Sequence, residues 1–240
     1  MSSSSALDYC PVLAEMARTR QAFGRSGRRF EDIGALSSLN NLIVLRALMQ
    51  DLKPDCTLEV GLSFGGSCLV FTMSHRDLGH APAAQHLALD PFQKQVWDDA
   101  GLLAVETSGL SGFLDFRSAF SAVELPRLWH EGRRFGFIYV DGSHLFEDVF
   151  LDAYFSVRLL AEGGVVAFDD SSDPHVAKVL AFLRRNLRGA LEEFDLSPYR
   201  LDGGKSLRYR LGGLLGRRQL TAFRRVGEVV RPWDAKFRPF

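Results

Sequence analysis

Apolar residues follow two different patterns along the chain. Helical spacing, with apolar residues three and four apart, occurs over residues 36–52 and again over 145–160, so we predict a helix in each segment. Asp173-Pro174 predicts the start of a further helix that extends to about residue 186. Short runs of adjacent apolar residues, typical of parallel strands that are covered on both faces, lie at 56–60, 86–90, 135–142 and 165–170.

Strands that alternate with helices predict an α/β fold with a doubly wound, mostly parallel Rossmann-like sheet. Two later segments, 206–211 and 219–226, are strand-like, and we expect them to form an antiparallel C-terminal edge. We expect one domain, 1–240, in which an N-terminal helical segment (1–55) precedes the α/β core (56–230).

Composition narrows the class of protein. Hydrophobic residues make up 46% and charged residues 24% of the chain, which favours a globular protein over a disordered one. No apolar run approaches the roughly 20 residues that span a bilayer, and residues 1–5 do not resemble a secretory signal. Three cysteines without CxxC spacing argue against a disulfide framework or a zinc knuckle, so we expect a cytoplasmic protein.

The net charge of zero hides an uneven distribution. Residues 176–240 contain 15 Lys/Arg and 6 Asp/Glu, whereas residues 1–175 contain 14 and 23. A basic segment is one feature of nucleic-acid-binding proteins. This segment lacks a nucleic-acid-binding motif, however, so we expect no nucleic-acid partner and instead attraction between the two halves of one fold.

Acidic residues lie at the carboxyl ends of the four predicted strands. They are Glu59, Asp90, Asp141 and the pair Asp169 and Asp170. Ligands of parallel α/β sheets bind at the carboxyl ends of the strands. A single Asp at such a position is usually a turn residue, but four acidic endings in phase favour a ligand site.

The first strand ends in a glycine turn, Glu59-Val-Gly61-Leu-Ser63-Phe-Gly65-Gly-Ser67. It is not the GxGxxG dinucleotide motif. The acidic Glu59 would repel a pyrophosphate and suits a ligand with a positive charge, and Asp90 is placed to accept hydrogen bonds from ribose hydroxyls. S-adenosylmethionine, a nucleoside with a cationic sulfur and an amino-acid tail, fits both requirements.

From about residue 36 to 226 the chain resembles a class I S-adenosylmethionine-dependent methyltransferase. Within that class it is similar to the small-molecule O-methyltransferases, which include catechol and macrolide-sugar O-methyltransferases. The resemblance rests on the order and spacing of four motifs: LEVGLSFGGS (58–67), LALDP (87–91), FIYVDGSHLFEDVFLD (137–152) and LLAEGGVVAFDD (159–170).

The resemblance implies an assignment of cofactor contacts. The residues that it places around the methionine part of the cofactor are Glu59, Gly61, Ser63, Gly65 and Ser67. It places Asp90 on the ribose, and it places Ser118 in the segment that contacts adenine. From the sequence we also expect the aromatic residues Phe64 and Phe92 near a ligand.

The resemblance also implies a second set of residues, for catalysis. Asp141, Asp169 and Asp170 match acids that bind Mg²⁺ or another divalent cation in metal-dependent members, and three carboxylates form an oxygen site that suits Mg²⁺. His144, in Asp-Gly-Ser-His, matches the general base of the sugar-modifying branch, and Asp141 would lie between cofactor and substrate. The expected reaction is displacement of the sulfonium methyl group by a deprotonated hydroxyl of a small molecule, such as a sugar or a polyphenol-like metabolite.

Three alternatives remain open from the sequence. Gly61-Leu-Ser63-Phe-Gly65 also fits the G-x-S-x-G elbow of an α/β-hydrolase, with Ser63 as nucleophile, Asp141 or Asp169 as the acid and His175 as the base. The chain could instead bind S-adenosylmethionine without turnover, or catalyse a different reaction on the same scaffold. His144 could also serve only as a helix cap, and the acids as turn residues. We expect no membrane partner, and a homodimer is the commonest assembly for such a protein.

Overall fold

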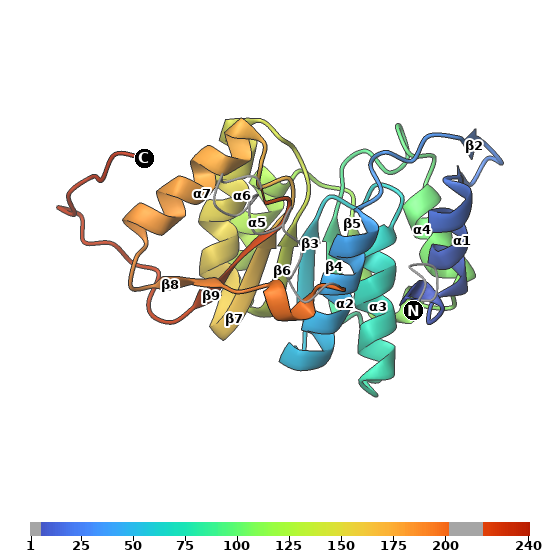
Figure 1. Cartoon of the computed structure of the whole chain (residues 1–240), viewed down its shortest axis with the longest axis horizontal. Helices are drawn as coiled ribbons and strands as arrows, with labels where there is room; N and C mark the ends of the chain where they lie inside the picture. Colours follow the sequence, from blue (N-terminus) through green and yellow to red (C-terminus); the bar gives the residue numbers. More distant parts are fainter. Residues whose placement is uncertain (1–5, 202–217) are drawn as a thin grey trace. The chain divides into compact units, whose positions relative to one another are not determined.

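The computed structural model describes residues 6–201 and 218–240, so the strand expected at 206–211 lies outside the described residues. The chain divides into two compact units, Met1–Phe120 and Ser121–Phe240 (Figure 1). The expected single domain stays a prediction.

The first unit begins with the helical segment expected from the sequence. Its elements are the helix α1 (Pro11–Thr19), a short antiparallel hairpin of β1 (Ala22–Phe23) and β2 (Arg29–Phe30), and the helix α2 (Leu39–Leu52). The backbone N–H of Asn41 donates a hydrogen bond of 3.2 Å to Oγ of Ser38, which caps the first turn of α2. The helical pattern of residues 36–52 is therefore confirmed, with the helix starting after its serine cap.

Three parallel strands form the sheet of the first unit, in the order β5-β4-β3. The elements are β3 (Thr57–Val60), α3 (Gly66–Asp77), β4 (His86–Leu89), α4 (Ala100–Thr107), the 3-10 turn η2 (Ser111–Phe113) and β5 (Leu114–Arg117). All residues of β3 and β4 are buried, and so is α3 from Gly66 to His75. Figure 1 shows α2 and α3 packed beside these strands. The sequence pattern predicted β3 and β4 but not α4 and β5.

The second unit contains four strands in the order β6-β7-β9-β8. Its elements are α5 (Ser121–His130), β6 (Phe135–Val140), α6 (Phe146–Leu159), β7 (Leu160–Phe168), α7 (Pro174–Asn186), β8 (Leu191–Phe194), the 3-10 turn η3 (Ser197–Tyr199) and β9 (Thr221–Arg225). Strands β6 and β7 are parallel, and β9 pairs antiparallel with both β7 and β8. The antiparallel edge predicted from residues 219–226 is therefore confirmed, and β8 is an additional strand.

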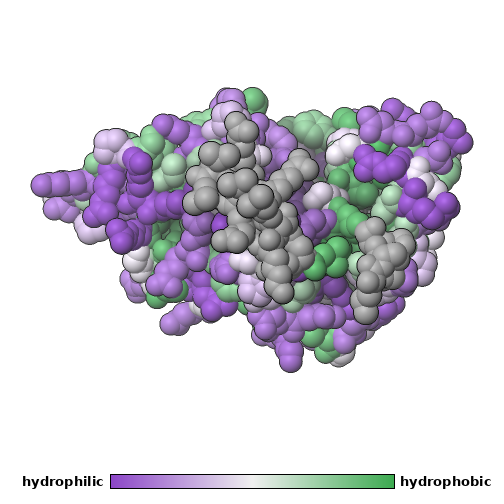
Figure 2. All heavy atoms as spheres, viewed as in Figure 1, coloured by the Kyte–Doolittle hydropathy of each residue, from purple (hydrophilic) through white to green (hydrophobic). Residues whose placement is uncertain are grey.

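The α/β fold class is confirmed, since in both units parallel strands are joined through helices. The face shown in Figure 2 is largely hydrophilic. Apolar side chains such as those of Leu58, Leu87, Phe137 and Val166 lie in the interior, each with 0–1% of its surface exposed. Across residues 6–201 and 218–240, no helix combines the length and the apolar character that crossing a membrane requires.

Candidate active site

The glycine turn between β3 and α3 has a left-handed backbone at three positions. The φ angles are +91° at Gly61, +48° at Ser63 and +80° at Gly65. A Cβ atom at Gly65 would lie 2.9 Å from the carbonyl oxygen of Gly101, and a Cβ atom at Gly101 would lie 2.6 Å from the carbonyl oxygen of Ser63. Glycine is therefore needed at both positions because the turn packs directly against the start of α4. The resemblance placed Gly65 around the methionine part of the cofactor, and in the structure the close neighbour of Gly65 is Gly101.

Asp90, directly after β4, is hydrogen-bonded to this glycine turn. Its Oδ2 atom accepts hydrogen bonds from the backbone N–H groups of Leu62 (3.2 Å) and Ser63 (2.9 Å) and from Nε2 of Gln93 (3.0 Å). Its Oδ1 atom accepts a hydrogen bond of 2.7 Å from the N–H of Phe92. Each carboxylate oxygen has about two acceptor positions, so the protein itself fills Oδ2 and one position of Oδ1, and one position of Oδ1 is left for the ribose.

Gln93 is a member of this site that the sequence analysis missed. It is 1% exposed, and its Nε2 group donates both to Asp90 and to the carbonyl oxygen of Ser63, at 2.7 Å for the latter bond. The amide thus joins the end of β4 to the middle of the glycine turn. Its position directly after Asp90-Pro91-Phe92 was the available signal, since a polar residue next to a strand-end acid often shares its network.

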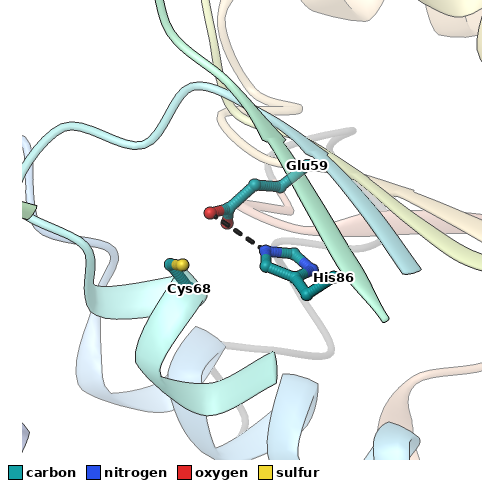
Figure 3. A group of neighbouring side chains, drawn as sticks. All are labelled: Glu59, Cys68 and His86. Carbon is teal, nitrogen blue, oxygen red and sulfur yellow. Dashed lines mark ion pairs between the residues drawn. The ribbon is translucent and has the colours of Figure 1, made fainter. Parts of the chain in front are cut away.

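Glu59 lies inside the protein, with 0% of its surface exposed. Its Oε2 atom accepts a hydrogen bond of 2.7 Å from Oγ of Ser67, and its Oε1 atom lies 3.1 Å from Nε2 of His86. Figure 3 shows the carboxylate of Glu59 pointing at the imidazole of His86, with Cys68 of α3 beside them. Burial and the neighbouring carboxylate of Glu59 raise the pKa of the Cys68 thiol well above its usual value. Two expected cofactor contacts, Glu59 and Ser67, therefore bind each other.

The ends of β4 and β5 carry an exposed aromatic pair. The rings of Phe92 and Phe120 meet edge to face, with centroids 5.7 Å apart, and are 48% and 59% exposed. Ser118, which follows β5, is also exposed. Phe64, in contrast, is 2% exposed and packs against the rings of Phe30 and Trp97. Of the two aromatic residues expected near a ligand, Phe92 is accessible and Phe64 belongs to the core.

In the second unit, the acids at the ends of β6 and β7 have different surroundings. The hydroxyl of Tyr139 faces Oδ2 of Asp169 at 2.5 Å and Oδ2 of Asp141 at 3.1 Å. Asp169 is 6% exposed, and its Oδ1 atom accepts a hydrogen bond of 2.8 Å from the N–H of Asp170. Tyr139 was also missed by the sequence analysis, although it lies two residues before Asp141 and therefore on the same face of β6.

His144 and Asp170 are in direct contact at the same place. Nε2 of His144 lies 3.1 Å from Oδ2 of Asp170, and the two side chains are 49% and 34% exposed. Oδ1 of Asp170 accepts a hydrogen bond of 2.6 Å from Gln219. Asp170 has a φ angle of +45°, a strained conformation for a residue other than glycine. Burial and the charge of Asp169 raise the pKa of the Asp170 carboxyl, while His144 opposes this shift.

The side chains that lie close together here differ in one member from the expected metal ligands Asp141, Asp169 and Asp170, which stay a prediction. The ligand atoms of Asp141, His144 and Asp170 lie within 4.8 Å of one another. Asp169, which we expected as the third ligand, instead binds Tyr139, and His144 takes its place in the group. A pocket of the second unit is lined by Asp141, His144 and Asp169 together with apolar side chains of β6, β7, α6 and α7.

Two sequence-based alternatives find no support in the described residues. Oγ of Ser63 is buried and has no hydrogen-bond partner among residues 6–201 and 218–240, whereas a nucleophilic serine needs a base within hydrogen-bond reach. His144 does not cap α6: the N–H of Phe146 donates a hydrogen bond of 3.1 Å to Nδ1 of His175 instead. His175 therefore has a structural partner, and the imidazole of His144 remains half exposed.

Comparison with known proteins points to one class. The chain resembles the solved structure of the O-methyltransferase TomG from Streptomyces achromogenes, in complex with S-adenosylmethionine, at 17% identity over 77% of this chain and 81% of that chain, with a TM-score of 0.60. The Bacillus cereus O-methyltransferase in complex with S-adenosylhomocysteine matches at 18% identity over 66% and 74%, with a TM-score of 0.54. The apo structure of CalS11, a TDP-rhamnose 3′-O-methyltransferase, matches at 18% identity over 78% and 79%, with a TM-score of 0.56.

These likenesses define the fold as that of the class I S-adenosylmethionine-dependent O-methyltransferases. Residues 58–171 match the family described as a methyltransferase domain. No curated protein matches the sequence. The resemblance drawn from the four sequence motifs is confirmed.

Proposed function

We propose that the protein transfers the methyl group of S-adenosylmethionine to a hydroxyl group of a small-molecule acceptor, with His144 as the general base. The observation that carries the proposal is the half-exposed pair of His144 and Asp170 beside Asp141, in a chain with a methyltransferase domain. The acceptor class remains a sugar or a polyphenol-like metabolite, as the sequence suggested.

The first unit would bind the cofactor. In this proposal the backbone of Gly61, Ser63 and Gly65 and the first turn of α3 at Ser67 face its methionine part. Oδ2 of Asp90 already accepts three hydrogen bonds, but Oδ1 accepts only one and can accept a second, from one ribose hydroxyl.

The exposed rings of Phe92 and Phe120 provide an apolar surface for the adenine base, and the Ser118 hydroxyl lies on the same strand ends. Glu59 is too deeply buried for direct contact with the cofactor. It acts through its negative charge, which favours a cationic sulfur, and through Ser67, whose hydroxyl it holds.

The second unit would activate the acceptor. With its Nε2–H directed at Asp170, the neutral imidazole of His144 keeps the lone pair of Nδ1 for the proton of the acceptor hydroxyl. The alkoxide oxygen then forms a bond to the methyl carbon, and the bond from that carbon to sulfur breaks, which leaves a neutral thioether. Asp170 stabilises the imidazolium that results, and the protein's main contribution is to position the reactants.

A divalent cation such as Mg²⁺ fits the same place. Carboxylate oxygens of Asp141 and Asp170 lie within 4.8 Å of each other, and hard cations prefer oxygen ligands, so these two carboxylates would hold the ion and Nδ1 of His144 would stay available to the acceptor hydroxyl. When bound, the ion would lower the pKa of the acceptor hydroxyl as a Lewis acid. Asp169 would then support the site indirectly, because Tyr139 joins it to Asp141.

The test is an assay for S-adenosylhomocysteine release with a panel of catechols and nucleotide sugars, in the presence of Mg²⁺ or of EDTA. We expect turnover with at least one hydroxylated acceptor and its loss in His144→Ala. Turnover that is unchanged in His144→Ala would refute the assignment of the base. Calorimetric titration with S-adenosylhomocysteine separates the two halves of the proposal, since cofactor binding is expected to survive that substitution.

A further inference from the structure

A continuous series of polar contacts runs from Glu59 to His80 through the interior of the first unit. Oε1 of Glu59 lies 3.1 Å from Nε2 of His86, and Nδ1 of His86 lies 2.8 Å from Oγ1 of Thr57. Oγ1 of Thr57 lies 2.9 Å from Nε2 of His75, and Nδ1 of His75 lies 2.9 Å from Nδ1 of His80. Every length is that of a hydrogen bond, although the contact between Glu59 and His86 departs from good hydrogen-bond geometry.

This series of contacts is shielded from solvent except at its His80 end. Glu59, His86, Thr57 and His75 are each 0% exposed, whereas His80 is half-buried. The ring of His86 stacks on Phe71 with a centroid separation of 4.7 Å. Groups that cannot reach water can exchange protons only through one another. Among these five residues, only His80 can therefore exchange a proton directly with solvent.

The contacts fix a consistent direction of donors. If His80 donates its Nδ1–H to His75, then His75 donates its Nε2–H to Thr57. The hydroxyl of Thr57 in turn donates to Nδ1 of His86, whose Nε2–H points at the carboxylate of Glu59. His75 and Thr57 then each donate once and accept once, while His80 only donates, His86 accepts from Thr57 and faces Glu59, and Glu59 is the final acceptor, which is the order that a proton-conducting chain requires.

The histidine in the middle of this series of contacts, His75, is not charged. Burial, with the neighbouring His86 and His80 adding to it, lowers the pKa of His75 to about 3, so His75 is neutral near pH 7. The groups facing Glu59 from α3 and β4 are Ser67, Cys68 and His86. At the opposite end, an ion pair of Arg46 in α2 with Asp77 lies near the end of α3.

The two ends of this series of contacts lie near the two ends of α3. Ser67, which binds Glu59, is in the first turn of that helix, and His80 follows its last residue, Asp77, by three positions. A helix carries partial positive charge at its N-terminus and partial negative charge at its C-terminus. The helix therefore favours an anion at Glu59 and a cation at His80.

We propose that Glu59, His86, Thr57, His75 and His80 form a proton relay that connects the buried carboxylate beside the glycine turn with solvent. In the forward step, protonated His80 gives its Nδ1 proton to His75, and one proton moves along each later contact until Oε1 of Glu59 is protonated. His80 and Glu59 end neutral, and the two middle histidines end neutral with their ring protons on Nδ1. No other reactant is needed.

The relay has a consequence that rests on the proposed function. The cofactor carries a positive sulfur before methyl transfer and a neutral sulfur afterwards. A negative Glu59 favours the first form, and a protonated Glu59 avoids an uncompensated buried charge beside the second. The relay thus allows the charge at Glu59 to follow the charge of the cofactor without opening the core.

The experiment follows the ring nitrogens by NMR in the full chain labelled with ¹⁵N-histidine. We expect the signals of His86 to change together with those of His80 when the pH of the sample is varied. Thr57→Val should abolish the response of His86 and leave that of His80, and Thr57→Ser should restore it. His130→Phe, which removes an exposed histidine of α5, is the control and should change neither signal.

Independent signals of His86 and His80 in the wild type would overturn the relay, and so would a response of His86 that survives Thr57→Val. Zinc found at Cys68 and His86 by metal analysis would overturn it too, because the metal would occupy the nitrogen that the relay needs. The NMR readout requires no cofactor. A failure of the proposed function, seen as absent S-adenosylhomocysteine binding, is therefore distinguishable from a failure of the relay.

Discussion

Nε2 of His144 lies 3.1 Å from Oδ2 of Asp170, so the carboxylate that follows β7 orients the imidazole that follows β6. An orienting carboxylate fixes which nitrogen of a histidine carries the proton. The pair joins a half-exposed imidazole to a residue with a strained backbone, since the φ angle of Asp170 is +45°.

His144→Ala should lower kcat by about 10²–10⁴-fold, the usual contribution of a general base. The affinity for S-adenosylhomocysteine should not change, since the residues assigned to the cofactor lie in the other unit. Steady-state kinetics and calorimetry on the same preparation check both parts. Equal loss of kcat and of cofactor affinity would contradict the assignment.

Asp90→Asn should loosen the glycine turn. The amide has one acceptor atom in place of two, so at least one of the N–H donors of Leu62, Ser63 and Phe92 loses its partner. We expect the free energy of unfolding to fall by about 1–3 kcal/mol, together with weaker binding of S-adenosylhomocysteine. The matched control is Asp115→Asn on β5, whose partner Arg117 lies on the same strand at 2.9 Å. If both variants lose equal stability and neither loses affinity, Asp90 does not hold the turn.

Gly101→Ala should destabilise the protein although alanine is the better helix former. The new Cβ atom would lie 2.6 Å from the carbonyl oxygen of Ser63, so the turn or α4 must move. The expected cost is about 1–3 kcal/mol with a lower affinity for the cofactor. Gly34→Ala, where the nearest atom is 3.4 Å away, serves as the control and should be nearly neutral in urea denaturation.

Asp152 on α6 should make the stability depend on pH. Burial raises its pKa from 3.8 to about 7, and Asp148 adds to the shift. The unfolded chain loses this proton first as the pH rises, so stability present below pH 3.8 is lost progressively up to about pH 7.

Asp152→Asn removes that loss, and the variant should gain stability relative to the wild type as the pH is raised from about 5 to 8, by up to a few kcal/mol. Glu147→Gln, an exposed acid on the same helix, should show no such gain. Urea denaturation at several pH values measures the difference. A constant difference between wild type and Asp152→Asn across this range would show that Asp152 is not protonated in the folded protein.

The sequence predicted the parts of the fold with strong periodicity. Strands such as Phe135–Val140 are continuously apolar because they are covered on both faces, and such a pattern can be recognised from the sequence alone. Strand β5 was missed because its residues are half-buried and include Asp115 and Arg117. Strand β8 was missed for a similar reason, since Glu192 and Glu193 are exposed at its centre.

The candidate site was predictable where a motif places residues close together in sequence. Asp141 and His144 share one loop, and Asp170 follows the next strand. The partners of Glu59 were not predictable, because His86 and Cys68 reach it only through the pairing of β3 with β4 and the packing of α3. A strand-end acid has the same appearance in sequence whether it faces a ligand or, like Glu59, the core.

The account depends most on whether this chain binds S-adenosylmethionine and uses it. Calorimetric titration with S-adenosylmethionine, followed by an assay for transfer of its labelled methyl group to a hydroxylated acceptor, tests this directly. The account predicts saturable binding at one site per chain and label in an ether linkage of the acceptor. No binding, together with labelling of Ser63 by a fluorophosphonate, would contradict it in favour of a serine hydrolase.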